Sequence, residues 1–359
     1  MAVLVSSALA SYGLGFVVHR LLRAHGIIDQ PNERTSHTVP TVRGGGLAIM
    51  AVVFSATLLA SGGRSPNINT LAVTAGAIAV ISFLDDLKSL GSVTRFFCHS
   101  LAALVVLWRM GWPEITLTLT PTTTLFLPPV LGVSLGFLWL VGYTNAFNFM
   151  DGINGLAAGQ ALITALGSAL LVGLLTDAWA SEPVIVAGAI AGASAGFLPH
   201  NFPKARMFMG DVSSAPLGFS LAVLVLWISR EKGWTWLVPL GLLHMNFVLD
   251  TGITLAKRIA RGERWYEPHR EHFYQRLVQS GRTHSFVTCW ELGLQFINLG
   301  MVALYLRGGF GVRIGVVVFT VALWLVFFRV CELRWRRSEN SHPTKSWLPP
   351  DKPLSERQA

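Results

Sequence analysis

Long apolar stretches alternate with short polar segments along almost the whole chain. A membrane-spanning helix needs about 20 mostly apolar residues. Eleven stretches fit this description, and they cover residues 3–22, 44–62, 68–84, 95–111, 126–144, 156–175, 184–202, 212–229, 235–256, 286–306 and 311–330. The pattern predicts an all-α fold, namely a polytopic integral membrane bundle of about 10–11 transmembrane helices.

The same pattern divides the chain into two parts. Residues 1–333 form the predicted transmembrane catalytic domain, with polar loops between its helices. Residues 334–359 form a polar, proline-containing cytoplasmic tail, which we expect to be poorly ordered. The first apolar stretch lacks a basic segment before it, so we interpret it as a span rather than a signal peptide.

Composition supports a membrane protein. Hydrophobic residues make up 52% of the chain and charged residues only 13%, whereas an average soluble domain is about 25% charged. The three cysteines are far apart, so they indicate neither a disulfide framework nor a zinc site. We attribute the net charge of +9 to loops beside anionic lipid, and we expect no nucleic-acid partner.

The basic residues are distributed unevenly between the two predicted sides. Of the 28 Lys and Arg residues, 22 fall on one set of alternate loops. Because cytoplasmic loops carry an excess of Lys and Arg, this set is assigned to the cytoplasm. The N-terminus is then predicted outside and the C-terminus inside.

Five polar motifs all fall on the predicted cytoplasmic side. They are IIDQPNERTSHTVPTVRGGG at 27–46, DDLKS at 85–89, NAFNFMDGING at 145–155, KARMFMGD at 204–211 and RGERWYEPHREHFYQRL at 261–277. Their common side supports the predicted topology.

Four carboxylates in these motifs, Asp85, Asp86, Asp151 and Asp211, lie at or near the ends of apolar helices. Carboxylates near hydrocarbon are unfavourable unless they are paired, solvated or metal-bound, and adjacent aspartates repel each other. Mg²⁺ prefers oxygen ligands and is often completed by substrate phosphates. Helix ends beside water also tolerate single aspartates, but the DD pair, the DG turn and the GD turn together favour a magnesium site.

Glycines next to these motifs suggest close backbone approach. Residues 44–46 could offer free N–H groups to an anion at the start of a helix. Gly152, Gly155 and Gly210 would let the backbone approach a ligand. No phosphate-binding P-loop or Rossmann fingerprint is present.

The basic segment 257–282 and Asp250 each leave two interpretations open. Topology alone predicts a basic cytoplasmic loop, but Arg270 and His272 also suit phosphate contact. His269 and His272 lack a further soft ligand for zinc. Asp250 lies inside an apolar stretch, where a carboxylate is either functional or part of a buried pair.

Together the motifs DDLKS, NAFNFMDGINGLA, FMGDVSS and PHREH resemble the polyprenyl-phosphate N-acetylhexosamine-1-phosphate transferases. That family includes the phospho-MurNAc-pentapeptide transferase and the enzymes that start O-antigen and teichoic acid linkage units. The resemblance runs from about Asp29 to Leu277. PNERTSHTVPTVRGGG and PHREHFYQRL resemble the WbpL-like, O-antigen-initiating branch.

Two positions depart from the family pattern. Much of the family has a run of histidines in the loop, whereas here only His272 keeps it, with Tyr274 and Gln275 in the later places. Asn154 stands where much of the family has Asp. The first departure argues against the peptidoglycan enzyme.

The resemblance implies transfer of an N-acetylamino-sugar-1-phosphate from a UDP-sugar to undecaprenyl phosphate, with release of UMP, to start a lipid-linked glycan. It also implies a bacterial inner membrane protein, dependence on Mg²⁺ with Mn²⁺ as a substitute, and it allows a homodimer. A multi-pass transporter is the alternative. It would place its polar residues near the bilayer midplane rather than at helix ends.

The resemblance further implies roles for individual residues. Asp85, Asp86 and Asp211 are the expected catalytic residues, and Asp86 and Asp211 are also the expected Mg²⁺ ligands. Asp85 would deprotonate or orient the acceptor phosphate, but a covalent route through Asp85 or Asp86 stays open. The expected substrate-binding residues are Arg43, Lys88, Asn145, Asn148, Asp151, Asn154, Arg270 and His272.

Overall fold

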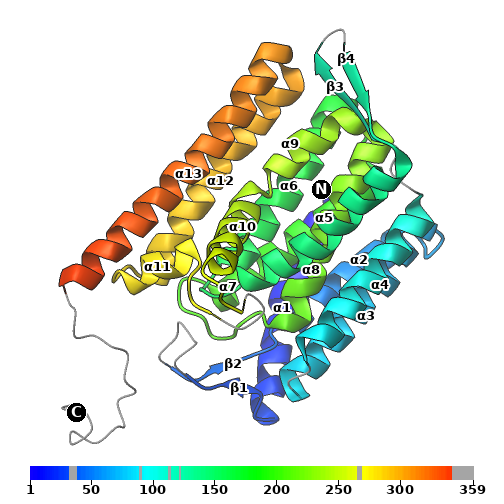
Figure 1. The fold of residues 1–359 in the computed structure, drawn as a ribbon. Coiled ribbons are helices and arrows are strands. Elements are labelled where there is room, and N and C mark those ends of the chain that lie inside the picture. The colour runs from blue at the N-terminus through cyan, green and yellow to red at the C-terminus, as the bar shows by residue number, and fades with distance from the viewer. Residues whose placement is uncertain (32–38, 89–90, 112–114, 121–122, 265–268, 342–359) are drawn as a thin grey trace, which may run out of the picture.

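The computed structural model describes residues 1–31, 39–88, 91–111, 115–120, 123–264 and 269–341, and they form a bundle of helices (Figure 1). The helices are α1 (Ala2–Ala24), α2 (Leu47–Ala60), α3 (Pro66–Lys88), α4 (Ser92–Met110), α5 (Pro129–Phe149), α6 (Leu156–Thr176), α7 (Glu182–Asn201), α8 (Asp211–Lys232), η1 (Trp234–Trp236), α9 (Leu237–Leu242), α10 (Met245–Ala260), α11 (Phe273–Gln279), α12 (His284–Arg307) and α13 (Phe310–Ser341). Two short antiparallel pairs join β1 (Ile28–Asp29) to β2 (Thr41–Val42), and β3 (Thr116–Thr120) to β4 (Thr123–Phe126).

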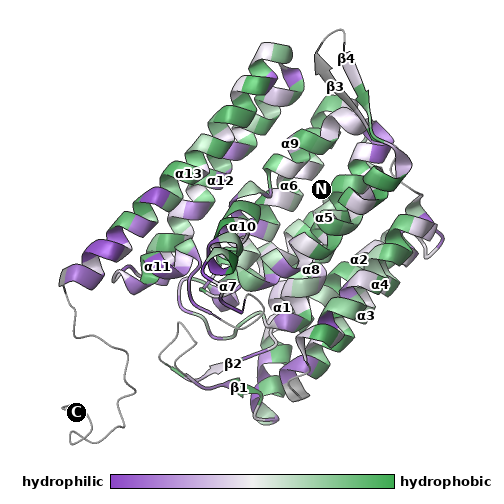
Figure 2. Ribbon diagram, viewed as in Figure 1, coloured by the Kyte–Doolittle hydropathy of each residue, from purple (hydrophilic) through white to green (hydrophobic). Residues whose placement is uncertain are grey.

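The helices confirm the prediction of a polytopic helical membrane protein. Within the described ranges, nine helices are long and apolar enough to cross a bilayer, or ten when the bent pair formed by 234–242 and α10 counts as one span. Hydrophobic residues run along the lengths of these helices, whereas hydrophilic residues gather at the far end of α13 and in the loop beside α10 (Figure 2). The chain is therefore a multi-pass membrane protein.

Two of the predicted spans differ in shape from the expectation. The second, expected over 44–62, is reduced to the 14 residues of α2. At 1.5 Å per residue this helix is about 21 Å long, less than the roughly 30 Å of a hydrocarbon core. The ninth, expected as one helix over 235–256, is bent by 71° between Leu242 and Met245.

Side-chain amides from neighbouring helices stabilise the bend. The Leu243 carbonyl accepts hydrogen bonds from Gln160 Nε2 at 3.0 Å and from Gln295 Nε2. The Leu242 carbonyl accepts one from Asn298 Nδ2 at 2.6 Å. In a membrane, broken helices persist only where the freed backbone groups find such partners. The bend therefore depends on residues of α6 and α12, which no local pattern near 242–245 reveals.

The C-terminal boundary also differs from the prediction. α13 continues without a break through Arg334 to Ser341, so the first part of the predicted tail is helical. The rest of that tail, residues 342–359, lies outside the described residues.

The central helix α8 positions the candidate site. Its apolar window is entirely buried, and it packs against α3 and α5. α8 begins at Asp211, so this carboxylate lies next to the C-terminal ends of both neighbours. α1 packs closely on α7 because Gly192 and Gly196 face its backbone. A Cβ on either glycine would lie 2.2 Å from the carbonyl oxygen of Leu4 or Ala8.

Candidate active site

Three acidic side chains from two helices meet two arginines at one end of the bundle. Arg43 Nη2 lies 2.7 Å from Asp86 Oδ1 and 3.2 Å from Asp211 Oδ1. Arg95 Nη1, from the first turn of α4, lies 3.0 Å from Asp85 Oδ2 and 3.3 Å from Asp211 Oδ2. Charge-assisted contacts of this kind are among the stronger polar interactions in proteins. The predicted catalytic carboxylates are therefore brought together, with Asp211 at the centre.

The Asp86 side chain is suited to hold a cation. It is only 4% exposed, whereas that of Asp211 is 20% exposed and connects the cluster to the surface. Among the described residues, neither carboxylate oxygen of Asp86 has a hydrogen bond of good geometry, although Oδ1 contacts Arg43. Because Asp86 shares the guanidinium of Arg43 with Asp211, a further cation would stabilise these two carboxylates.

The donor set fits Mg²⁺ completed by substrate. Within the described part of the chain, no group of three or more His, Cys, Asp or Glu side chains forms a ready-made metal cage. Mg²⁺ is commonly held by one or two carboxylates together with water and substrate phosphates. Asp86 and Asp211 supply oxygen ligands of the right kind and charge.

The end of α5 and the turn after it complete the cluster. Asn148 Nδ2 donates to Asp211 Oδ2 at 3.4 Å, and Ser214 Oγ donates to Asn148 Oδ1. Asp151 lies in the turn between α5 and α6, and burial together with nearby Asp211 raises its pKa well above the usual range. Of the predicted substrate-binding residues, Asn148 and Asp151 therefore lie at the site.

Other predicted residues bond to groups outside the acidic cluster or are only partly described. Asn145 Nδ2 donates to the Val141 carbonyl of its own helix at 2.7 Å. Asn154 Nδ2 donates to the Pro203 carbonyl at 3.1 Å and so joins the α5–α6 turn to the α7–α8 loop. Lys88 is the last residue of α3, and its side chain lies outside the described residues.

Backbone pairing positions Arg43. Gly45 N donates to the Phe208 carbonyl at 2.8 Å, and Gly46 N donates to the Met209 carbonyl at 2.9 Å. The expectation that residues 44–46 offer free N–H groups to an anion is therefore wrong for Gly45 and Gly46. These donors instead align the segment that carries Arg43 with the segment that leads to Asp211.

The glycines beside the motifs allow close packing inside the protein, and their approach to a ligand stays a prediction. A Cβ on Gly46 would lie 2.1 Å from Ser213 Cβ, and one on Gly210 would lie 3.0 Å from Gly44 N. Gly155 faces the Phe202 ring in the same way, at 2.7 Å. Gly210 also adopts φ +77°, which disfavours other residues.

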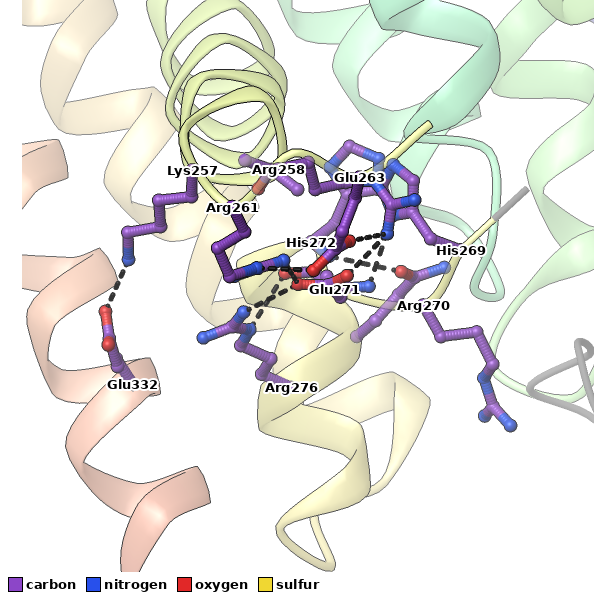
Figure 3. A network of polar contacts seen from close by, with 12 residues as sticks. Lys257, Arg258, Arg261, Glu263, His269, Arg270, Glu271, His272, Arg276 and Glu332 are labelled. Carbon is purple, nitrogen blue, oxygen red and sulfur yellow. Dashed lines mark hydrogen bonds and ion pairs between the residues drawn. The ribbon is translucent and has the colours of Figure 1, made fainter. Parts of the chain in front are cut away.

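The basic loop is mostly held by ion pairs within itself. Glu271 contacts Arg258, Arg261 and Arg276, and Glu263 contacts the first two of these (Figure 3). The structural interpretation of these arginines is therefore favoured. Arg270, by contrast, extends away from Glu271 (Figure 3).

The two histidines of the loop are not exposed cations. His272 is 4% exposed, and its Nδ1 lies 2.9 Å from Asp250 Oδ1. Burial, followed by the charges of His272 and Arg258, lowers the pKa of His269 to about 4, so this ring is neutral at pH 7. Asp250 therefore belongs to a buried pair with His272, which is one of the two interpretations that its sequence position left open.

Sequence reasoning missed Arg95 and Ser214. Arg95 was counted only as one basic residue among many, because nothing near it forms a motif. Its position ten residues after Asp85, across the connection from α3 to α4, is the only signal that could have suggested it. Ser214 lies one turn beyond Asp211 on α8, on the side that faces Asn148.

Fold and site together define a multi-pass helical membrane protein with an acidic, arginine-bridged site at the ends of its spans. Comparison with known proteins makes this class specific. The family model for glycosyl transferase family 4 matches residues 68–229, which include Asp85, Asp86, Asp151 and Asp211. The chain belongs to this family.

Several relatives are similar over most of their length. The decaprenyl-phosphate N-acetylglucosaminephosphotransferase of Mycolicibacterium smegmatis is 32% identical over 307 residues, which cover 78% of this chain and 75% of that protein. The protein of the same name from Mycobacterium tuberculosis H37Rv is 32% identical over 326 residues, covering 83% and 80%. A probable undecaprenyl-phosphate N-acetylglucosaminyl 1-phosphate transferase of Bacillus subtilis is 27% identical, covering 87% and 83%.

Proposed function

We propose that this protein transfers an N-acetylamino-sugar-1-phosphate from a UDP-sugar to undecaprenyl phosphate and releases UMP. The observation that carries this proposal is the position of Asp211 at the start of α8, joined through Arg43 to the buried Asp86. The relatives add support, because their names specify polyprenyl phosphates as acceptors and N-acetylglucosamine phosphate as the transferred group. Initiation of O-antigen or another cell-envelope polysaccharide is the pathway that we propose.

The reaction forms a bond between an oxygen of the lipid phosphate and the β-phosphorus of the UDP-sugar. The bond from that phosphorus to the bridging oxygen breaks, and UMP leaves with its electron pair. Catalysis of this kind depends mainly on positioning and on neutralising charge. Asp86 and Asp211 would hold Mg²⁺, which when bound would offset the negative charge of the diphosphate.

The remaining residues act directly on the substrates. Arg43 and Arg95 supply positive charge beside the carboxylates and would neutralise phosphate oxygens there. Asp85, held by Arg95 at 3.0 Å, would orient the acceptor phosphate. Because a phosphate monoester with a second pKa near 6 is mostly dianionic at neutral pH, a strong base is unnecessary. Asn148 and Asp151 would contact the nucleotide part of the donor.

We further propose that the site faces the cytoplasm of a bacterial inner membrane, with the N-terminus outside and the C-terminus inside. This orientation requires an odd number of crossings, so the proposal includes the short helix α2 as an eleventh crossing beside the ten spans. The support is the excess of Lys and Arg on the loops at the site's end of the bundle. UDP-sugars are cytoplasmic metabolites, which agrees with this orientation. A homodimer stays a prediction.

The bent ninth span is a feature that would favour a transporter, since transporters use broken helices near the midplane. Its freed carbonyls, however, are already paired with amides of Gln160, Gln295 and Asn298. The acidic residues, in contrast, lie together at helix ends, where Arg43 and Arg95 bridge them. The geometry therefore favours chemistry at the helix ends over transport through the bend.

The test is release of UMP by purified protein in detergent with Mg²⁺, undecaprenyl phosphate and a panel of UDP-sugars. We expect release that requires both substrates, and loss of it in Asp211→Asn while the protein still reaches the membrane. Asp177→Asn is the matched control, because Asp177 lies in the α6–α7 turn, has φ +51° and tolerates Asn there. Absence of UMP with every UDP-sugar, or full activity of Asp211→Asn, would overturn the proposal.

A further inference from the structure

The carboxylate of Asp250 binds the N-terminal end of the short helix α11. Its side chain is completely buried in α10, and Oδ1 accepts hydrogen bonds from His272 Nδ1 at 2.9 Å and from Phe273 N at 3.1 Å. Its Oδ2 accepts one from Tyr274 N at 3.3 Å. The first N–H groups of a helix have no partners within that helix, and a carboxylate there is stabilising. One side chain of α10 therefore fixes where α11 begins.

Tyr274, in the first turn of α11, connects that helix to the turn that carries Asp151. The Tyr274 side chain is completely buried, and its Oη donates to the carbonyl oxygen of Phe149 at 3.0 Å. Phe149 is the last residue of α5 and precedes Asp151 by two positions. The last carbonyl groups of a helix have no N–H partner within that helix. The Tyr274 hydroxyl supplies a donor to one of them at the C-terminus of α5.

The Tyr274 hydroxyl also lies directly against Gly152. A Cβ added to Gly152 would be 2.0 Å from Tyr274 Oη and 3.0 Å from Cζ. Van der Waals contact between such atoms needs about 3.5 Å, so residue 152 can carry no side chain while this hydroxyl is present. The glycine of the DG turn and the tyrosine of the loop are therefore a matched pair.

We infer that Asp250 and Tyr274 are positioning residues for the donor side of the active site. They act through a chain of direct contacts that runs from α10 to α11 and on to the turn holding Asp151. The inference rests on the proposed function and deepens it. It assigns roles to a buried carboxylate outside the acidic cluster and to Tyr274, which stands where much of the family has histidine.

Three variants and one double variant test this inference. Tyr274→Phe keeps the ring and removes only the hydrogen bond to Phe149. Asp250→Asn keeps the size of the side chain but presents an amide to an N–H donor. Gly152→Ala forces its methyl group against Tyr274 Oη. Combining Gly152→Ala with Tyr274→Phe removes the closest atom and leaves Cζ at 3.0 Å.

The readouts separate positioning from general damage. For Tyr274→Phe and Asp250→Asn we expect KM for the UDP-sugar to rise about tenfold, equivalent to about 1.4 kcal/mol. KM for undecaprenyl phosphate should stay within about twofold, since the acceptor is proposed to meet Asp85 rather than Asp151. Loss of folded protein would lower kcat without this difference between the substrates. Gly142→Ala in α5 is the control, because nothing lies within 4 Å of its Cβ position.

The double variant supplies the decisive comparison. Gly152→Ala should lose most activity and have a lower Tm than wild type. The combination with Tyr274→Phe should be at least about tenfold more active than Gly152→Ala and should regain part of the lost Tm. A double variant no better than Gly152→Ala, or unchanged KM values in Tyr274→Phe, would overturn the inference. If wild-type protein releases no UMP, the proposed function fails. The Tm values of the single and double variants still decide whether the contact exists.

Discussion

Gly46→Ala offers a sharp test of how the acidic site is assembled. Gly46 immediately precedes α2 and has φ −63° and ψ −13°, a conformation that alanine adopts without strain. The added methyl carbon would nevertheless lie 2.1 Å from Ser213 Cβ and 2.9 Å from the carbonyl oxygen of Met209. The effect of the substitution is therefore steric and arises where α2 meets the start of α8.

The size of the effect follows from these distances. Carbon atoms in contact are about 3.5 Å apart, so the two segments must separate by about 1.4 Å or more. Overpacking of this kind typically lowers stability by about 1–3 kcal/mol. Arg43 lies three residues before Gly46, and its guanidinium is 2.7 Å from Asp86 and 3.2 Å from Asp211. A misplacement of about 1 Å at a catalytic site can lower the rate by about a hundredfold.

We therefore expect Gly46→Ala to release UMP about a hundredfold more slowly than wild type and to have a lower Tm in detergent. Ser213→Gly removes both atoms of the Ser213 side chain that the methyl group would meet, so the combination with Gly46→Ala should recover much of both losses. Gly142→Ala is a control with open space around its Cβ position. Wild-type activity and Tm in Gly46→Ala would refute the reasoning, as would a double variant that recovers neither quantity.

Three further predictions concern charge and packing. The pKa of Asp151 is higher in the folded protein than in the unfolded chain, where it is near 4. Above about pH 4 the unfolded chain therefore loses this proton more readily, and the folded state becomes less stable as the pH rises. In metal-free buffer, the Tm of Asp151→Asn relative to wild type should therefore increase as the pH rises above about 4. A Tm difference that does not change with pH would contradict this prediction. Arg95→Gln should lower activity about ten- to a hundredfold, since charged hydrogen bonds contribute about 1.5–3 kcal/mol, and Arg95→Lys should retain more; equal activity of all three proteins would remove Arg95 from the site. Gly192→Ala should lower the Tm because its methyl group would meet a backbone carbonyl of α1 at 2.2 Å, whereas Gly188→Ala, with nothing within 4 Å, should not.

Much of the architecture could be predicted because the bilayer imposes a local requirement. A segment of about 20 apolar residues is driven into hydrocarbon whatever its neighbours are, so the expected spans are helical in the structure, although the second is short and the ninth is broken. The acidic residues were found for a related reason. Asp85, Asp86, Asp151 and Asp211 stand out because carboxylates are rare beside such segments. Counting the spans between these residues placed all four on the same side of the membrane.

The contacts of these residues were decided by tertiary structure alone. The sequence does not reveal how far each helix is rotated about its axis, yet this rotation brings Arg95 of α4 to Asp211 of α8. The glycines at 45 and 46 illustrate the same limit. Their small size was evident, but only the neighbouring segment at 208–209 shows that their N–H groups pair with backbone carbonyls.

The bend after Leu242 and the role of Asp250 have the same explanation. Local hydropathy favours a continuous ninth span, and amides from α6 and α12, far away in the chain, make the broken form stable. The sequence shows Asp250 only as a carboxylate inside an apolar stretch. Its hydrogen-bond partners, at the start of α11, become visible only in the folded structure. Burial in the membrane depends on each segment's own composition and was therefore determined by sequence. Polar partners depend on which segments become neighbours, and only the folded bundle fixes that.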